Sequence, residues 1–513
     1  MRYGVYQPEG FSGECNAALP QCVKELARLL DTTQRQFAYD NLRLDRKGLQ
    51  EMAGVLVDFA VDVHGAIGLW DTYERYNVEF FGVPLPLTAV TKPDGIHKDR
   101  IRHLLWVLYP ELVPGLVFSP HHPDLERITI ASVSFLRERI CPLPRDSGVK
   151  AFLATPNEFG WDVKRKLVWL GSKSYLFRLL YTHYVAEHGK GADLIADTDD
   201  FICQEPTEWS GLGAIDILAG VLDISEGERG ELRGWYERHV APYRILSVTT
   251  ETQTALNVVS NEPYTIRINM ERSPFKVGEV VFGSLVPWRG EWYWSGQQQV
   301  LPSMTPEAID DLAATMRHHH SQLVCRYWKD YERQVREQAV KLHKRMMAYS
   351  KSDLQVYPDG LSMAADWQKE MTSMWNAASP EAVQDAVKRH GLTRGRPDLS
   401  LPDDLLNSRN GVAVFINPDE GKEIFRGYND IVSGLRKRGQ GLTGEEVSAV
   451  RGIVLDTVAS PAFVRRVVSE HGSESIKEAF FLRKCPEAFW LEYLLRSRKG
   501  RYFRRRYPSV AVI

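Results

Sequence analysis

The pattern of apolar and polar residues changes its period along this chain, and these changes divide it into regions. From Cys22 to about Val240, apolar residues recur at helical spacing in Val23–Leu30, Leu49–Leu69 and Ile101–Leu108. Prolines interrupt these runs, and proline ends a helix because it lacks an amide hydrogen and restricts the residue before it. This region is therefore predicted to be a set of short helices.

Between Tyr243 and about Leu301, apolar residues alternate with polar ones, as they do in half-buried strands. Turn residues such as Pro263, Gly278 and Gly290 separate the runs. The predicted strands are Tyr243–Val248, Ala255–Val259, Tyr264–Asn269, Val280–Val286 and Glu291–Trp294. Short strands joined by tight turns predict a small curled sheet or barrel.

The helical period returns at Thr305, and Asp310–Tyr349 predicts one long charged helix or two collinear helices. One further strand, Gly411–Asn417, precedes helices that continue to the end of the chain. The predicted fold class is α+β: a predominantly helical multidomain protein with a small antiparallel β-barrel-like insert. The four predicted domains are a helical N-terminal domain, a β-barrel-like module, a helical region with a long basic helix, and an α-rich C-terminal region with a basic tail, at residues 1–240, 241–302, 303–400 and 401–513.

Charge and cysteine usage narrow the class of protein. The formal net charge is −2 and the isoelectric point is about 6.7, so any site for a polyanion has to be local. The six cysteines are scattered without a Cys-x-x-Cys pair, which favours a reducing cytoplasm. The first residues lack the apolar core of a signal peptide, and no apolar run has the length of a membrane span, so we expect no membrane partner. No motif indicates a cofactor.

Tryptophans gather at the end of the predicted β-module. Trp292 and Trp294 share one face of a strand, and Trp288 precedes the turn before it. An exposed surface made of these three side chains is typical of a protein interaction hot spot. A protein partner at this module is therefore one hypothesis.

Two basic stretches suggest contact with DNA or RNA. In the first, Arg326, Lys329 and Arg333 lie on the predicted long helix, near aromatic residues. The second is the C-terminal tail, whose basic residues are Arg496, Arg498, Lys499, Arg501, Arg504, Arg505 and Arg506. Clustered cations bind phosphate backbones, and aromatic rings stack on unpaired bases. The alternative is that the tail pairs with an acidic surface elsewhere in the protein.

A hydrolytic enzyme, in the manner of a metal-dependent nuclease, is the hypothesis from a different class. Asp162 and Lys164 have the acidic-x-Lys spacing of such enzymes, and Asp199, Asp200 and His239 supply further candidates. Asp199 and Asp200 lie in a predicted acidic loop beside Cys203, whose thiol is predicted to be buried and structural. Adjacent histidines point about 100° apart on a helix, so His318-His319-His320 predicts no metal site.

Several long strings resemble an uncharacterised bacterial family, a domain of unknown function. They are Asn157–Leu180, Asp199–Gly213, Gly234–His239 and Leu494–Pro508. The resemblance covers most of the chain. It implies a bacterial, cytoplasmic protein and carries no catalytic residue, because the family has no assigned activity.

The predicted β-module is similar to a small domain of other uncharacterised bacterial proteins, some of which carry a cysteine-rich zinc-binding motif. The shared residues are Tyr243-x-Ile245, Tyr264-Thr-Ile266, Phe275–Gly278 and Leu285–Trp292. The cysteines of that motif are absent here, so no zinc site is implied. Taken together, the sequence predicts a cytoplasmic binding protein that contacts nucleic acid, with the enzyme and the interaction scaffold as alternatives.

Overall fold

In the computed structural model, the protein forms two compact units. The first holds residues 1–332 and 486–501, and the second holds residues 333–485 and 502–513. The structure describes the chain with the exception of residues 1–5, 189–193, 206, 208, 269–272, 320–328, 382, 385–386, 388–398, 420, 484–489 and 504–508.

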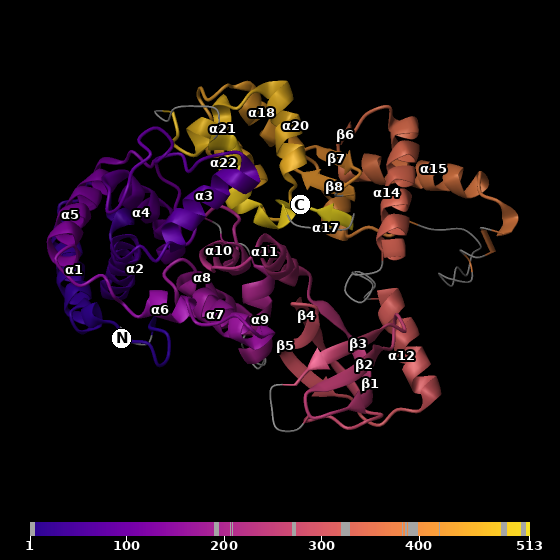
Figure 1. Ribbon diagram of the computed structural model, residues 1–513. Coiled ribbons are helices and arrows are strands. Elements are labelled where there is room, and N and C mark those ends of the chain that lie inside the picture. The colour runs from indigo at the N-terminus through magenta and orange to yellow at the C-terminus, as the bar shows by residue number, and fades with distance from the viewer. Residues whose placement is uncertain are drawn as a thin grey trace. The chain divides into compact units, whose positions relative to one another are not determined.

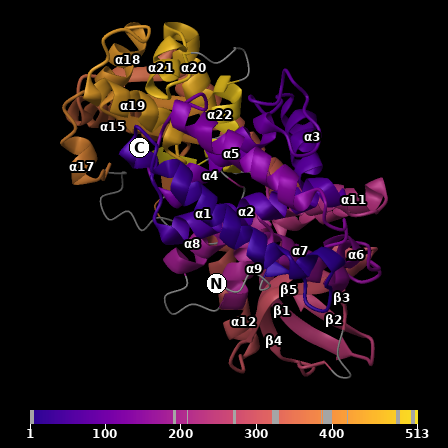
Figure 2. The ribbon, with the colours of Figure 1, turned by 90° about the vertical axis from the view of Figure 1, so that its left-hand side faces the viewer.

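The first unit is built on a helical core. Its helices are α1 (Leu19–Gln34), α2 (Arg46–Gly65), α3 (Leu69–Phe81), α4 (Lys98–Leu112), α5 (Pro123–Ile140), α6 (Val149–Leu153), α7 (Gly160–Lys173), α8 (Arg178–His188), α9 (Leu194–Gln204), α10 (Ala214–Val221), α11 (Glu226–Arg233), α12 (Pro306–His319) and α22 (Trp490–Arg498). Figures 1 and 2 both show α1, α2, α4 and α5 side by side. The mixed α+β class is confirmed, with helix in large excess over strand.

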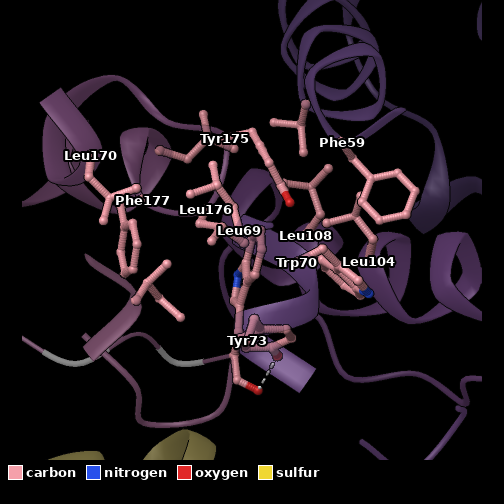
Figure 3. Close-up of a cluster of buried hydrophobic side chains, with 14 of the residues drawn as sticks. Phe59, Leu69, Trp70, Tyr73, Leu104, Leu108, Leu170, Tyr175, Leu176 and Phe177 are labelled. Carbon is pink, nitrogen blue, oxygen red and sulfur yellow. Dashed lines mark hydrogen bonds between the residues drawn. The ribbon is translucent and has the colours of Figure 1, made fainter. Parts of the chain in front are cut away.

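Helix α2 lies at the centre of this core. Asp45 begins it by accepting a hydrogen bond from the Gly48 amide at 2.7 Å, which satisfies an otherwise unpaired donor of the first turn. Most of its apolar residues, among them Phe59, are buried, and the rings of Phe59 and Trp70 meet edge to face at a centroid distance of 5.0 Å (Figure 3). This edge-to-face geometry adds to the stability gained by burying the two rings.

Within the described residues, no single helix has the length and apolar composition to cross a membrane. Helices α2 and α3 meet that test only as a pair, and they are bent by 86° at the break between them.

Five strands close into a ring beside this core: β1 (His239–Val248), β2 (Thr252–Asn257), β3 (Pro263–Arg267), β4 (Val280–Trp288) and β5 (Glu291–Val300). They pair in the order β1-β2-β3-β5-β4, and β4 returns to β1. Four of the pairings are antiparallel, but β3 and β5 run parallel where Ile266 meets Trp292. The prediction of a wholly antiparallel sheet is therefore wrong at this one pairing, because the two strands that complete the ring run in the same direction.

The five-stranded sheet, β1–β5, has two apolar surfaces. Its own core contains Tyr243, Ile266 and Leu285, with Trp292 and Trp294 packed against them. Val286, Trp288 and Tyr293 belong instead to the core of the helical part. Because neighbouring residues of a strand point to opposite faces, β5 packs both within its sheet and against the helices. Helix α12 lies along the outside of this sheet, as Figure 1 shows, and Ala313 packs against Val258 and Val259.

The acidic stretch around Asp199 is helical, contrary to the prediction of a loop. Asp197, Asp199 and Asp200 all lie on α9. Phe201 and Ile202 are buried on the same helix, so an apolar face holds it against the core. The prediction was wrong because packing on one face, together with ion pairing, outweighs the weak helix propensity of aspartate.

The second unit contains a four-stranded sheet covered by helices. Its described strands are β6 (Leu354–Tyr357), β7 (Val412–Asn417), β8 (Gly421–Arg426) and β9 (Ser509–Val512), in that order. The pairing of β8 with β9 is parallel, and the other two pairings are antiparallel. Its helices are α14 (Lys329–Ser350), α15 (Gly360–Asn376), α17 (Asp403–Leu406), α18 (Tyr428–Arg436), α19 (Gly444–Leu455), α20 (Pro461–His471) and α21 (Glu474–Ala479), of which the first turn of α14 belongs to the first unit.

One strand of this sheet matches the sequence prediction, since β7 coincides with the predicted Gly411–Asn417 to within one residue. The prediction that helices continue from there to the end of the chain is wrong, because β8 and β9 follow. β9 is too short to give a recognisable alternation, and its pairing partner, β8, is distant in sequence. The predicted helix over Asp310–Tyr349 corresponds to α12 and α14, with residues 320–328 between them outside the described part.

Candidate functional site

Four side chains, three on α7, α9 and β5 and one just before β1, meet between the helices and the five-stranded sheet. Lys164 on α7 donates to the Asp199 carboxylate on α9 and to Ser295 Oγ on β5, the latter at 2.8 Å. Ser295 Oγ in turn donates to Asp199 Oδ1 at 2.9 Å. Arg238, which directly precedes β1, donates to both Asp199 and Asp200. We call Lys164, Asp199, Arg238 and Ser295 the Lys164 cluster.

The local backbone makes room for this cluster. Gly296 follows Ser295 and has a φ of +69°, a conformation that favours glycine. A Cβ atom at this position would lie 2.6 Å from Asp199 Oδ2. The glycine therefore allows the backbone of β5 to approach the carboxylate closely, and Ser295 reaches it as a result.

Ionic interactions keep Asp199 charged although it is only 2% exposed. Burial alone would raise the pKa of this carboxyl, but the positive charges of Lys164 and Arg238 outweigh that effect and lower it. The cluster also contacts Cys203, whose Sγ lies 3.6 Å from Lys164 Nζ. Burial raises the pKa of this thiol. The predicted burial of Cys203 is confirmed.

The candidate residues of the enzyme hypothesis lie in three different settings. Lys164, Asp199 and Asp200 come together through Arg238. Asp162 caps the start of α7 instead, accepting a hydrogen bond from the Phe159 amide at 3.0 Å. These positions bring only part of the predicted set into hydrogen-bond range.

His239 points into the five-stranded sheet, away from the Lys164 cluster. Its Nε2 atom lies 3.1 Å from Asn257 Nδ2, and its ring meets that of Tyr264 at a centroid distance of 4.9 Å. Among the described residues, no group of three or more His, Cys, Asp or Glu side chains is arranged to hold a metal ion. Ser295, which the sequence reasoning missed, uses its hydroxyl hydrogen on Asp199, and both residues are almost fully buried. The arrangement is that of an ion-pair network that joins three elements.

A second polar link joins α7 to the five-stranded sheet. Lys166 is buried and donates to Thr155 O and Asn157 Oδ1, each at 2.5 Å. The carbonyl oxygen of Asn157 accepts a hydrogen bond from Trp288 Nε1 at 3.0 Å. Burial lowers the pKa of Lys166 to about 8, since its acceptors are neutral.

The tryptophans do not form the exposed surface that the sequence suggested. Trp288 is completely buried and packs against Trp235 at a centroid distance of 6.2 Å. Trp292 and Trp294 are partly buried against the core of their own sheet. Trp288 is therefore excluded from an exposed hot spot, because it fills the junction between the sheet and the helices.

The basic tail is divided between buried and exposed positions. Arg496 and Lys499 are buried, and the Arg496 guanidinium lies 4.0 Å from the centre of the Phe81 ring. Arg501 is exposed and binds both carboxylate oxygens of Glu205 at 2.8 Å. Arg498 is half-buried on α22. Arg504, Arg505 and Arg506 lie outside the described residues. The burial of Arg496 and Lys499 removes these two residues from the predicted phosphate-binding set.

The described charged side chains of helix α14 lie at the surface. Arg333, Arg336, Lys341, Lys344 and Arg345 are all exposed. Among the side chains of α14 that the structure describes, Met346 is buried and packs with the core of the second unit. Lys329 begins the helix, and Arg326 lies outside the described residues. This surface, from Arg333 to Arg345, is named the α14 basic face.

The comparisons with known proteins give one partial match. A protein-family model described as "Protein of unknown function (DUF3843)" matches residues 46–186, which include α2 to α7 and most of α8. No curated protein and no solved structure matches the chain. The match ends before the five-stranded sheet, so the likeness of that module to zinc-motif proteins stays a prediction. Residues 46–186 therefore carry a domain of unknown function, consistent with the uncharacterised family that the sequence resembles.

Proposed function

We propose that this protein is a binding protein that contacts the phosphate backbone of a nucleic acid through the α14 basic face. The observation that carries the proposal is the exposure of five cations between Arg333 and Arg345, with Glu337 as the one acidic residue among them. Lysine and arginine bind phosphates by releasing condensed counterions, so affinity of this kind does not require base-specific contacts.

The length of this face suits a run of phosphates. Arg333 and Arg345 are twelve positions apart, which corresponds to about 18 Å along a helix at its usual rise of about 1.5 Å per residue. Phosphates repeat about every 3.4 Å along one strand of a duplex, so several fall within that span. The long side chains extend this reach further.

The direct test is binding of labelled duplex and single-stranded DNA and RNA across a salt series. The test variant replaces Arg333, Arg336, Lys341 and Lys344 with glutamine. Its control removes the same charge from four exposed cations of the first unit, Lys24, Arg28, Arg46 and Lys47. A third variant, Arg504→Gln/Arg505→Gln/Arg506→Gln, tests the C-terminal tail separately.

We expect the wild-type protein and the control to bind with a steep salt dependence, and the α14 variant to bind weakly. For duplex DNA, each phosphate interaction that the substitutions remove should reduce the slope of log K against log salt by about 0.9. Equal weakening in the test and control variants would mean that only net charge matters, and no binding at low salt would refute the proposal. Weakening confined to the tail variant would move the binding surface to residues 504–506.

The enzyme alternative has less structural support. Lys164, Asp199 and Ser295 hydrogen-bond to one another, and Asp199, Ser295 and Cys203 are each no more than 2% exposed. A general base must reach the proton that it removes from the substrate. A buried cluster of paired charges therefore fits a structural role better than the role of a general base.

A further inference from the structure

Lys164 and Cys203 bring an amine and a thiol together in a buried setting. Their Nζ and Sγ atoms are 3.6 Å apart, on neighbouring helices α7 and α9. Each is held in place by other contacts: Lys164 by Asp199 and Ser295, and Cys203 by complete burial one helical turn from Asp199. The pairing therefore follows from the packing of these elements and does not depend on a mobile side chain.

Cys203 differs from the other described cysteines in its surroundings. All four described cysteines, Cys15, Cys22, Cys141 and Cys203, are free thiols. The Sγ atom of Cys15 donates to Asn16 Oδ1 at 3.7 Å, and Cys141 is exposed. At Cys203 the neighbouring nucleophile is an amine, so an oxidised sulfur there would react with nitrogen.

We propose that Lys164 and Cys203 form an oxidative cross-link in which one oxygen atom bridges Nζ and Sγ. The oxidant is dioxygen. The ammonium of Lys164, whose side chain is 19% exposed, first releases a proton to solvent, which leaves a neutral amine. This amine, the thiol and dioxygen then give an N–O–S bridge and one water molecule. Nitrogen and sulfur each lose one hydrogen and two electrons, and dioxygen takes up the four electrons.

Two features of the site favour this product over other oxidation products of cysteine. An intervening oxygen spans more of the 3.6 Å separation than a direct sulfur–nitrogen bond does, so the helices need to move less. Cys203 is also completely buried, which excludes bulky thiols such as glutathione while admitting a small neutral oxidant. The cross-link ties α7 to α9 and removes the positive charge that Lys164 presents to Asp199 and Ser295.

The test measures the mass of the full-length protein and of its proteolytic peptides after exposure to oxygen, with and without dithiothreitol. We expect a peptide pair joined through Lys164 and Cys203, heavier by one oxygen and lighter by two hydrogens than its separate parts, and released by the reductant. Variants Lys164→Arg and Cys203→Ser should lack this pair. Variant Cys141→Ser, which removes an exposed thiol, should keep it.

The wild-type measurement decides the proposal even if a variant folds poorly. Complete alkylation of Cys203 after denaturation of the oxygen-treated protein would overturn the proposal, because the thiol would then be free. A joined pair that has lost hydrogens without gaining oxygen would indicate a direct sulfur–nitrogen bond and would also refute the bridge. Added oxygen on Cys203 without any joined peptide would mean ordinary over-oxidation of the thiol and would equally exclude the bridge.

Discussion

The Lys164 cluster and the α14 basic face both contain several charged residues, but they use charge in opposite ways. In the cluster, Asp199 is buried and paired with two cations from different elements. On α14, the cations stay exposed along one helix. A buried charge is stable only with its partners in place, whereas an exposed charge contributes little to stability and faces solvent. The first arrangement therefore supports the fold, and the second suits binding.

The largest loss of stability is expected from Asp199→Asn. This substitution leaves Lys164 and Arg238 facing a neutral amide in a buried setting, and breaking a buried ion pair costs about 3–5 kcal/mol. Urea unfolding followed by tryptophan fluorescence measures the change. The control is Asp200→Asn, whose carboxylate also binds Arg238 but has a side chain that is 51% exposed, so that a loss within about 1 kcal/mol is expected. Equal losses for the two variants would contradict the importance of burial.

A buried, uncharged histidine should make the stability of the protein depend on pH. His103 is completely buried and bonds through Nε2 to Tyr493 OH at 3.1 Å, and burial lowers its pKa to about 3. Between about pH 6.5 and 3, the unfolded chain binds a proton here that the folded chain does not, so stability falls as the pH falls through this range.

The loss at His103 should reach about 2 kcal/mol at pH 5, relative to pH 7.5. We expect His103→Gln to lose less stability over this range, whatever its stability at pH 7.5. The exposed His183→Gln serves as the control and should follow the wild-type protein. If the free energy of unfolding changes with pH in parallel for all three proteins, His103 does not titrate differently in the folded and unfolded states.

The close approach of β5 to Asp199 predicts a smaller loss of stability for Gly296→Ala. The new methyl group would meet Asp199 Oδ2, and alanine is strained at a positive φ, so a loss of about 1–3 kcal/mol is expected. Gly290→Ala is a matched control, because Gly290 also has a positive φ but no atom within 4 Å of the added Cβ. If the two variants are equally destabilised in urea unfolding, backbone strain accounts for the whole effect and the contact with Asp199 contributes nothing.

The smallest change in stability is expected on the α14 basic face. Lys341→Gln should alter the free energy of unfolding by no more than about 0.5 kcal/mol, as is usual for exposed positions. The same variant should reduce the salt slope of nucleic-acid binding by about 0.9 if Lys341 contacts one phosphate. A clear loss of stability would indicate that Lys341 has a structural role.

Regular patterns in the sequence account for the part of the fold that could be predicted. Alternating residues predicted the strands from Tyr243 to Trp294, and the structure has strands in each of these places. The parallel pairing of β3 with β5 has no local signal, because it depends on how the ring closes. The helix α9 was missed for a similar reason, since its Asp199 is stabilised by Lys164 and Arg238, which are distant in sequence.

The candidate site shows the same division. Lys164, Asp199 and Asp200 were selected from residue type and spacing, but nothing near them in sequence indicated Arg238 or Ser295. The sequence did contain a signal that Cys203 lies beside Asp199. Residues 199 and 203 share one face of a helix, although this signal can be used only once α9 is recognised as a helix. The basic tail gave the opposite result, since composition could not separate the buried Arg496 and Lys499 from the exposed Arg501.

The sequence by itself determined the local properties of this protein: the helical and strand periods, the aromatic content of the β-module, and the concentration of cations on α14. Tertiary structure alone decided which charges are buried, which are paired, and which side chains from α7, α9 and β5 meet. The physical reason is that periodicity acts between residues a few positions apart, whereas burial and ion pairing join residues as distant as Lys164 and Ser295. Only folding brings such residues within hydrogen-bond range.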